Sequence, residues 1–175
     1  FRLSCDYPSD RLMIIEGSVG NGRDRLPGVS YKGVAYGAMR HIPRRWPKLR
    51  NAAFMLQSRR LASPLVKQAI QFKAEAILTV TNRLEWVLAA MVAVRLSIPL
   101  HLINHDSWNQ TFVLPNYMWP RVNAAFTSTY RSATSRLCVS PYMVDYYESM
   151  YGAPGTVLYP CRAKEVPDFP GPPTN

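Results

Sequence analysis

The sequence predicts an α/β domain of three layers, built on a mostly parallel sheet. Short apolar runs rich in β-branched residues recur along the chain, which is typical of parallel strands buried on both faces. Segments of helical length separate these runs, as helices and strands alternate in α/β folds. The run at 77–80 leads through one helical segment to the run at 100–103, and so short a crossover favours a right-handed unit of two parallel strands.

The composition indicates one globular domain in a reducing compartment. A chain of 175 residues, 47% of them hydrophobic, can hold a single domain with a sizeable core. Cys5, Cys138 and Cys161 are an odd number of cysteines without metal-ligand spacing, which favours reduced thiols over a disulfide or a zinc site. No signal-peptide pattern and no apolar run of transmembrane length is present in the sequence. We therefore expect a cytoplasmic protein without a bound metal.

Two strands are predicted near the N-terminus, at 12–15 and 29–36, from apolar and alternating patterns. The segment between them is charged and contains Gly17, Gly20 and Gly22, which invite comparison with a phosphate-binding loop. These glycines lack the order of a dinucleotide fingerprint and open no apolar helix. We therefore interpret the segment as an exposed connection, with no ligand assigned to its glycines.

The next segment is strongly basic. Residues 25–74 contain eleven Lys or Arg and no acidic residue, so they carry more positive charge than the formal net charge of +10 of the whole chain. Within it, 49–61 has the pattern of a basic amphipathic helix, and Ser63-Pro64 is expected to cap and open another helix over 65–72.

Three interpretations of these cations stay open. A solvated surface is the simplest, and an anionic membrane surface is next, because basic residues beside Trp and Phe favour the lipid interface. Nucleic acid is least favoured, since the chain carries no nucleic-acid motif. The candidate membrane- or anion-binding residues are Arg44, Arg45, Arg59 and Arg60.

A strand, helix, strand unit organises the middle of the chain. After the strand at 77–80, Asn82 and Glu85 have the spacing of a capping box. The helix expected over 84–96 is apolar all round, which suits a buried position, and it is too short to span a membrane.

The last third of the chain repeats this alternation. An aromatic loop at 108–118 precedes a helix at 121–132 and a strand at 137–139. Ser140-Pro141 caps and opens a helix that ends at Gly152, and a strand at 156–159 follows. We expect the α/β domain to span residues 1–160, and the Pro-rich residues 161–175 to form a linker or tail.

Polar residues follow three of the predicted strands, where parallel sheets bind their ligands. The candidate substrate-binding residues at these strand ends are Asn82, Asp106, Ser107, Trp108 and Ser140, and His105 is the candidate for the reacting centre among them. They form an active-site-like set without a complete catalytic group.

The end of this order resembles a known family. Residues 137–143, followed by Tyr147, by 151–154 and by 156–160, are similar to the end of the N-terminal domain in group 1, family 4-like glycosyltransferases of the GT-B fold. The segment that ends in His105-Asp106 is similar to the one that carries an active-site histidine in that family. The resemblance covers roughly residues 70 to 161.

The resemblance implies a Rossmann-like, acceptor-side half of a glycosyltransferase that moves a sugar from a nucleotide sugar to a glycan or lipid acceptor, with retention. It implies that His105 is catalytic and faces the transferred sugar, that Asp106 shapes the loop, and that Trp108 could stack on a sugar face. No cofactor or metal is implied beyond the nucleotide sugar as substrate. Such a protein would serve polysaccharide or glycolipid synthesis at the inner face of a membrane.

The family's first strand and glycine-rich loop would precede Phe1, and its C-terminal domain would follow Asn175. We therefore expect this chain to be part of a longer protein and not to transfer sugar alone. Two alternatives from other classes remain: a non-catalytic sugar- or nucleotide-binding module, and a basic peripheral membrane-binding domain. The sugar, the nucleotide, the acceptor and the oligomeric state are not predicted.

Overall fold

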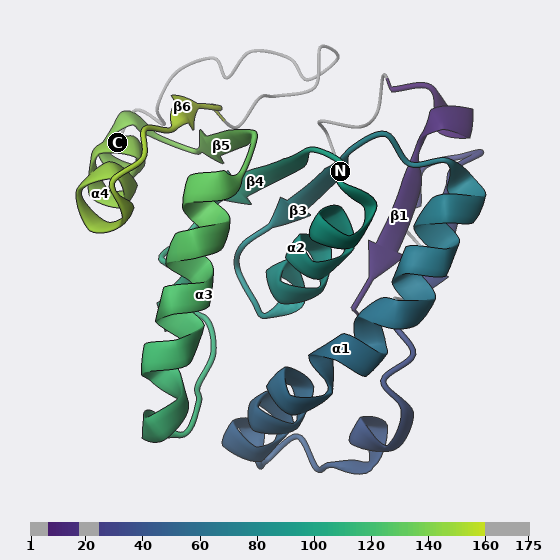
Figure 1. Ribbon diagram of the computed structural model, residues 1–175, viewed down its shortest axis with the longest axis horizontal. Helices are drawn as coiled ribbons and strands as arrows, with labels where there is room; N and C mark the ends of the chain where they lie inside the picture. The colour runs from purple at the N-terminus through teal and green to yellow at the C-terminus, as the bar shows by residue number, and fades with distance from the viewer. Residues whose placement is uncertain (1–6, 18–24, 160–175) are drawn as a thin grey trace, which may run out of the picture.

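The computed structural model describes residues 7–17 and 25–159, which form two parallel sheets and four α-helices (Figure 1). In chain order the elements are β1 (Met13–Glu16), β2 (Ser30–Gly33), α1 (Pro47–Phe72), β3 (Ile77–Val80), α2 (Glu85–Leu96), β4 (Leu100–Asn104), α3 (Trp119–Ser132), β5 (Ser135–Cys138), α4 (Pro141–Tyr151) and β6 (Thr156–Val157). Each predicted strand is confirmed with bounds that shift by a few residues. Gly20, Gly22, Cys5, Cys161 and the Pro-rich residues 161–175 lie outside the described residues.

The larger sheet confirms the α/β class with parallel strands. Its order is β3-β4-β5-β6, and each neighbouring pair is parallel. β4 lies inside the sheet, and its Leu102 and Ile103 are buried because helices and neighbouring strands surround them. The βαβ unit predicted around residues 77–103 is therefore confirmed.

The described helices lie on one face of this sheet. A strand order that follows the chain order, with right-handed crossovers, places α2, α3 and α4 on the same side. Figure 1 shows α1, α2 and α3 on the near side of the strands. On the other face, Leu78 and Val80 of β3 remain 55% and 39% exposed. The architecture is thus compatible with a Rossmann-like fold, while a third layer stays a prediction.

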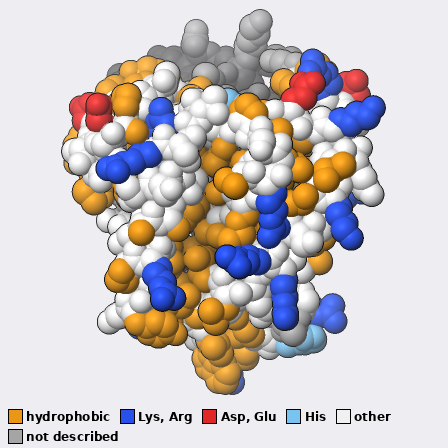
Figure 2. All heavy atoms as spheres, viewed as in Figure 1, with side chains coloured by type: hydrophobic (Ala, Val, Ile, Leu, Met, Phe, Trp, Pro, Cys, Tyr) orange, Lys and Arg blue, Asp and Glu red, His pale blue; other side chains and the backbone are white. Residues whose placement is uncertain are grey.

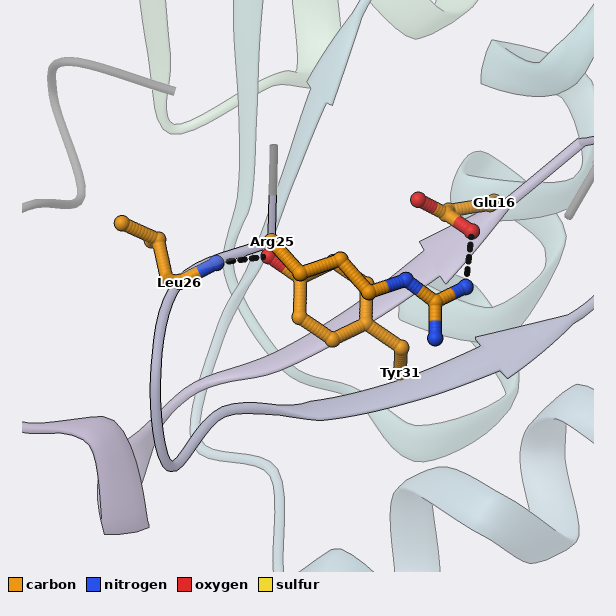
Figure 3. A network of polar contacts seen from close by, with 4 residues as sticks. All are labelled: Glu16, Arg25, Leu26 and Tyr31. Carbon is orange, nitrogen blue, oxygen red and sulfur yellow. Dashed lines mark hydrogen bonds and ion pairs between the residues drawn. The ribbon is translucent and has the colours of Figure 1, made fainter. Parts of the chain in front are cut away.

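The first two strands pair with each other, from Met13 opposite Ser30 to Glu16 opposite Gly33. Figure 3 shows the contacts beside this pair, where the Arg25 guanidinium donates to the Glu16 carboxylate at 3.1 Å. The same guanidinium lies 4.6 Å from the centre of the Tyr31 ring, whose oxygen accepts the Leu26 N–H at 2.9 Å. These contacts hold the turn that enters β2.

Two side-chain contacts connect this small sheet to the unit that begins at β3. Arg11, before β1, donates to Glu75, before β3, at 3.1 Å. At the other end of the strands, the Tyr36 hydroxyl donates to the Glu85 carboxylate of α2 at 3.4 Å. The two contacts therefore join the small sheet to this unit both before and after their strands.

The prediction of two helices over 49–72 is wrong, because α1 is one helix of 26 residues. Pro64 lies inside it, so Ser63-Pro64 does not open a new helix. An internal proline removes one backbone hydrogen bond and costs about 3 kcal/mol. Burial of Leu61, Ala62 and Leu65 on the inner side offsets that cost, and Pro64 itself is exposed.

The start of α2 also differs from the prediction. Its N-cap is Leu84, and no side chain caps it, so the capping box between Asn82 and Glu85 is wrong. The Glu85 carboxylate instead accepts from Tyr36, which is 49 residues away in sequence. The helix is not buried all round either, since Val94 is 78% exposed.

The start and end of α4 confirm the sequence prediction. The Ser140 hydroxyl oxygen accepts the Met143 N–H at 3.2 Å, and Pro141 occupies the first turn. Gly152 ends the helix with φ +67°, a left-handed conformation that suits glycine.

Aromatic side chains dominate the core between the helices and the sheet. Phe126 of α3 stacks on Trp108 with ring centres 4.2 Å apart and meets Trp86 of α2 edge-on at 5.1 Å. Tyr147 and Tyr151 of α4 pack against Tyr130 of α3. This cluster packs three helices against Trp108, and so it holds the loop after β4 from the core side.

Candidate functional site

Parallel pairing brings Asn82 and His105 to the ends of neighbouring strands. The Thr81 N–H bonds to the Ile103 carbonyl at 2.9 Å, so β3 and β4 stay paired up to the residues just before these two. Asn82, His105 and Asp106 are exposed. We call Asn82, His105, Asp106, Ser107 and Ser140 the strand-end rim.

A buried polar network supports the rim. Asn104 is fully buried; its side-chain oxygen accepts from the Thr81 hydroxyl at 2.9 Å, and its amide donates to the Leu137 carbonyl at 3.3 Å. Its amide also lies 3.7 Å from the Cys138 sulfur. These bonds tie β3, β4 and β5 together one residue before His105. The backbone that presents the imidazole is therefore held in place.

The loop that follows His105 is held by α4. The Tyr147 hydroxyl donates to the Asp106 carbonyl at 2.7 Å and accepts the Trp108 N–H at 3.3 Å. The Trp108 ring N–H donates to the Tyr151 hydroxyl at 2.7 Å. Burial raises the pKa of the Tyr147 and Tyr151 hydroxyls above the usual value, which keeps them neutral and able to donate.

The sugar-stacking role considered for Trp108 does not fit this structure. Its side chain is 1% exposed, and both ring faces are within a cluster with Phe126, Phe112 and Trp119. The resemblance implied a Trp108 that faces a sugar, but a large indole gains more by entering the core. Trp108 anchors the rim from inside.

The remaining rim residues differ in how free they are. The Ser140 oxygen is engaged as the cap of α4 and the residue is half-buried, so only its O–H could reach a ligand. Ser107 is half-buried at the start of a short 3-10 turn, Trp108–Gln110. The exposed polar groups that a ligand can reach most directly are those of Asn82, His105 and Asp106.

The structure shows a polar pair that the sequence did not predict: the Tyr36 hydroxyl and the Glu85 carboxylate meet beside Gly17, at the end of β1. A side chain at Gly17 would place its Cβ 2.6 Å from a Glu85 oxygen and 2.9 Å from the Tyr36 hydroxyl oxygen. Burial and the nearby Glu85 carboxylate raise the pKa of Tyr36. The absence of a side chain at Gly17 therefore lets Glu85 and Tyr36 lie directly against the backbone. The pair joins residues distant in sequence, and no local pattern could reveal it.

Cys138 is a structural residue. It is a free thiol, fully buried in β5, and burial raises its pKa above the usual value. A protonated, enclosed thiol is a poor nucleophile. Within residues 7–17 and 25–159, no group of three His, Cys, Asp or Glu side chains could hold a metal ion.

The four predicted anion-binding residues fall into two places on the basic segment. Arg44 and Arg45 lie in the turn before α1, where the Arg45 guanidinium is 5.5 Å from the Trp46 ring centre. Arg59 and Arg60 lie on the exposed side of α1. Within the described parts of the chain, no ion pair holds any of the four.

A hollow that the sequence did not predict lies between α2 and α3. It has a volume of about 290 Å³, with Ala93 and Val94 on one side and Ser128 and Ser132 on the other. Figure 2 shows a hydrophobic strip running down the middle of this face. The hollow lies on the helix side of the sheet, away from the strand-end rim.

Comparison with protein-family models, with curated proteins and with solved structures found no match for the chain. In the described part of the chain, no helix has the length and apolar character needed to cross a membrane.

Proposed function

We propose that the chain is the acceptor-side α/β domain of a GT-B glycosyltransferase and that the strand-end rim binds the acceptor. The observation that carries the proposal is the placement of Asn82 and His105 at the carboxyl ends of adjacent parallel strands. Ligands of open α/β sheets bind at this position, because loops and helix N-termini converge there. The resemblance of residues 70–161 to the family supports the choice of a sugar as ligand.

His105 is the residue assigned to the reacting sugar. Its imidazole is exposed, and its backbone is fixed on one side by buried Asn104 and on the other by the Tyr147 bond to Asp106. A neutral imidazole held in this way can donate one hydrogen bond to, or accept one from, a sugar hydroxyl. Asn82 and Asp106 supply an amide and a carboxylate for neighbouring hydroxyls.

The reaction that follows from the resemblance is transfer from a nucleotide sugar to a glycan or lipid, with retention. A second domain would grip the donor, so the isolated chain would bind an acceptor without turning it over. His105 then acts at the reacting sugar from the acceptor side, and no metal is required for that role.

The first test measures acceptor binding by the chain itself. Saturation-transfer NMR with a panel of methyl glycosides and free nucleoside diphosphates would show which class binds. We expect a glycoside to bind and His105→Ala to weaken it about tenfold, the worth of one hydrogen bond of about 1.4 kcal/mol. His41→Ala is the matched control, because His41 is exposed but lies in the turn before α1.

The second test measures transfer by the polypeptide that the gene encodes, using radiolabelled nucleotide sugars and membrane extract. Label in a lipid or glycan, lost in His105→Ala and kept in His41→Ala, would support the transferase. Glycoside binding with no transfer by that polypeptide would overturn the transferase in favour of a sugar-binding module. Undiminished transfer by His105→Ala would remove His105 from the mechanism.

A further inference from the structure

One side of α1 exposes large apolar side chains to solvent. Leu49, Leu56 and Ile70 are 50%, 80% and 59% exposed. They are spaced by seven and fourteen residues, and an α-helix drifts by only about 20° in seven residues, so the three share one side. The opposite side carries the buried residues, among them Ser58, Leu61 and Leu65. We call the exposed side the outer face of α1.

Cations surround these apolar residues. Lys48, Arg59, Arg60 and Lys67 are exposed on or beside the outer face, and α1 contains no acidic residue. The two ion pairs formed by the described residues use Arg11 and Arg25, so neither of them neutralises α1. Figure 2 shows Lys and Arg gathered over the region where Figure 1 places α1, with acidic side chains near the upper edge.

The turn before α1 extends this surface. Trp46 is 50% exposed, and the Arg45 guanidinium lies over its ring at 5.5 Å. The other tryptophans are more enclosed: Trp86 and Trp108 are 1% exposed, and Trp119 is half-buried. A half-exposed indole beside Arg44 and Arg45 has the composition of a lipid-headgroup contact.

We propose that the outer face of α1, together with Arg44, Arg45 and Trp46, docks on an anionic lipid surface. The apolar side chains enter the boundary between headgroups and acyl chains, while the cations meet the lipid phosphates. Nucleic acid would use the cations but would gain nothing from Leu56 or Ile70. If α1 only faced water, the apolar side chains of Leu56 and Ile70 would stay solvated among the cations without a binding role. The proposal is independent of the glycosyltransferase assignment.

Vesicle co-sedimentation of the 175-residue chain tests the proposal. Vesicles of phosphatidylcholine with phosphatidylglycerol are compared with phosphatidylcholine alone across a salt series. We expect binding only with the anionic lipid, and less of it as salt screens the charges. Trp46 should report insertion by a blue shift and by quenching with brominated lipid, both lost in Trp46→Phe.

Two variants separate the charged from the apolar contribution. Arg59→Gln with Arg60→Gln should weaken binding about 30-fold, since each cation near an anionic surface contributes about fivefold. Leu56→Ser should weaken it about tenfold through lost apolar burial. All three positions are exposed, so circular dichroism should show an unchanged fold.

Matched controls come from the other helices. Arg95→Gln with Arg121→Gln removes two exposed charges from α2 and α3, and Val94→Ser replaces a side chain as exposed as Leu56. These variants should bind vesicles as the parent chain does. A loss equal to that of the α1 variants would overturn the proposal.

Two other results would also overturn it. One is full vesicle binding by Leu56→Ser together with equally tight binding of duplex DNA, which would make α1 a general polyanion surface. The other is dimerisation of the parent chain, abolished by Leu56→Ser, in the absence of vesicle binding. That result would assign the apolar residues to a second copy of the chain.

Discussion

Tyr147→Phe tests how the core holds the strand-end rim. The Tyr147 hydroxyl donates to the Asp106 carbonyl at 2.7 Å and accepts the Trp108 N–H at 3.3 Å. Phenylalanine keeps the ring, its packing against Phe126 and the volume of the site, and removes the hydroxyl together with these two bonds. The substitution therefore isolates the hydroxyl.

The expected loss in the free energy of unfolding depends on the exposure of the two hydrogen-bond partners. Asp106 is exposed, so water can replace the hydroxyl at its carbonyl. Trp108 is 1% exposed, and its N–H would be left without this partner in an apolar site. An unsatisfied buried donor costs about 1–3 kcal/mol, so we expect a loss of about 2 kcal/mol in the free energy of unfolding. For a chain of this size that lowers Tm by about 4–8 °C.

Urea unfolding, followed by circular dichroism, measures the change, with Tyr142→Phe as the control. Tyr142 sits on the same helix and is 81% exposed, so its hydroxyl should contribute almost nothing. Hydrogen exchange should also speed up at residues 106–108, and glycoside binding at the rim should weaken with it. A loss below about 0.5 kcal/mol, or an equal loss in Tyr142→Phe, would refute the reasoning.

Two further predictions concern titration and helix continuity. Burial raises the pKa of four tyrosines above the usual value of 10.0: Tyr36, Tyr130, Tyr147 and Tyr151. The unfolded chain therefore releases these protons at lower pH than the folded chain does. The free energy of unfolding should fall above about pH 10, by up to about 1.4 kcal/mol per pH unit for each residue. Unfolding midpoints at rising pH, with absorbance at 295 nm as the titration signal, test this, and a flat profile between about pH 9 and 11 would contradict it. Pro64→Ala should stabilise the chain by about 1–3 kcal/mol, because alanine restores the N–H to a continuous α1. An unchanged or lower Tm would contradict this estimate of the proline's cost.

The sequence predicted the parts of the fold that depend on local pattern. The apolar runs of β3 and β4 and the helix between them appear where expected. Ser140 caps α4 and Gly152 ends it, because capping needs only residues close in sequence. The positions of Asn82 and His105 at adjacent strand ends were predictable for the same reason, because a short crossover between two strands favours parallel pairing.

The failures involve contacts between distant residues. Pro64 has the local features of a helix start, but packing of Leu61 and Leu65 carries α1 through it. The carboxylate of Glu85 was expected to cap its own helix, and it accepts from Tyr36 instead. The resemblance implied that Trp108 faces a sugar, whereas Phe126, in the next helix, completes its burial. A single sequence does not encode these partners locally.

The boundary between core and site falls between two consecutive residues. Asn104 is fully buried and satisfied by Thr81 and Leu137, while His105 is exposed. Because Asn104 and Tyr147 hold the backbone on either side, His105 contributes little to the fold and can be changed without moving the rim. A functional loss in His105→Ala would therefore report on the imidazole itself, which makes it the most informative single substitution in this chain.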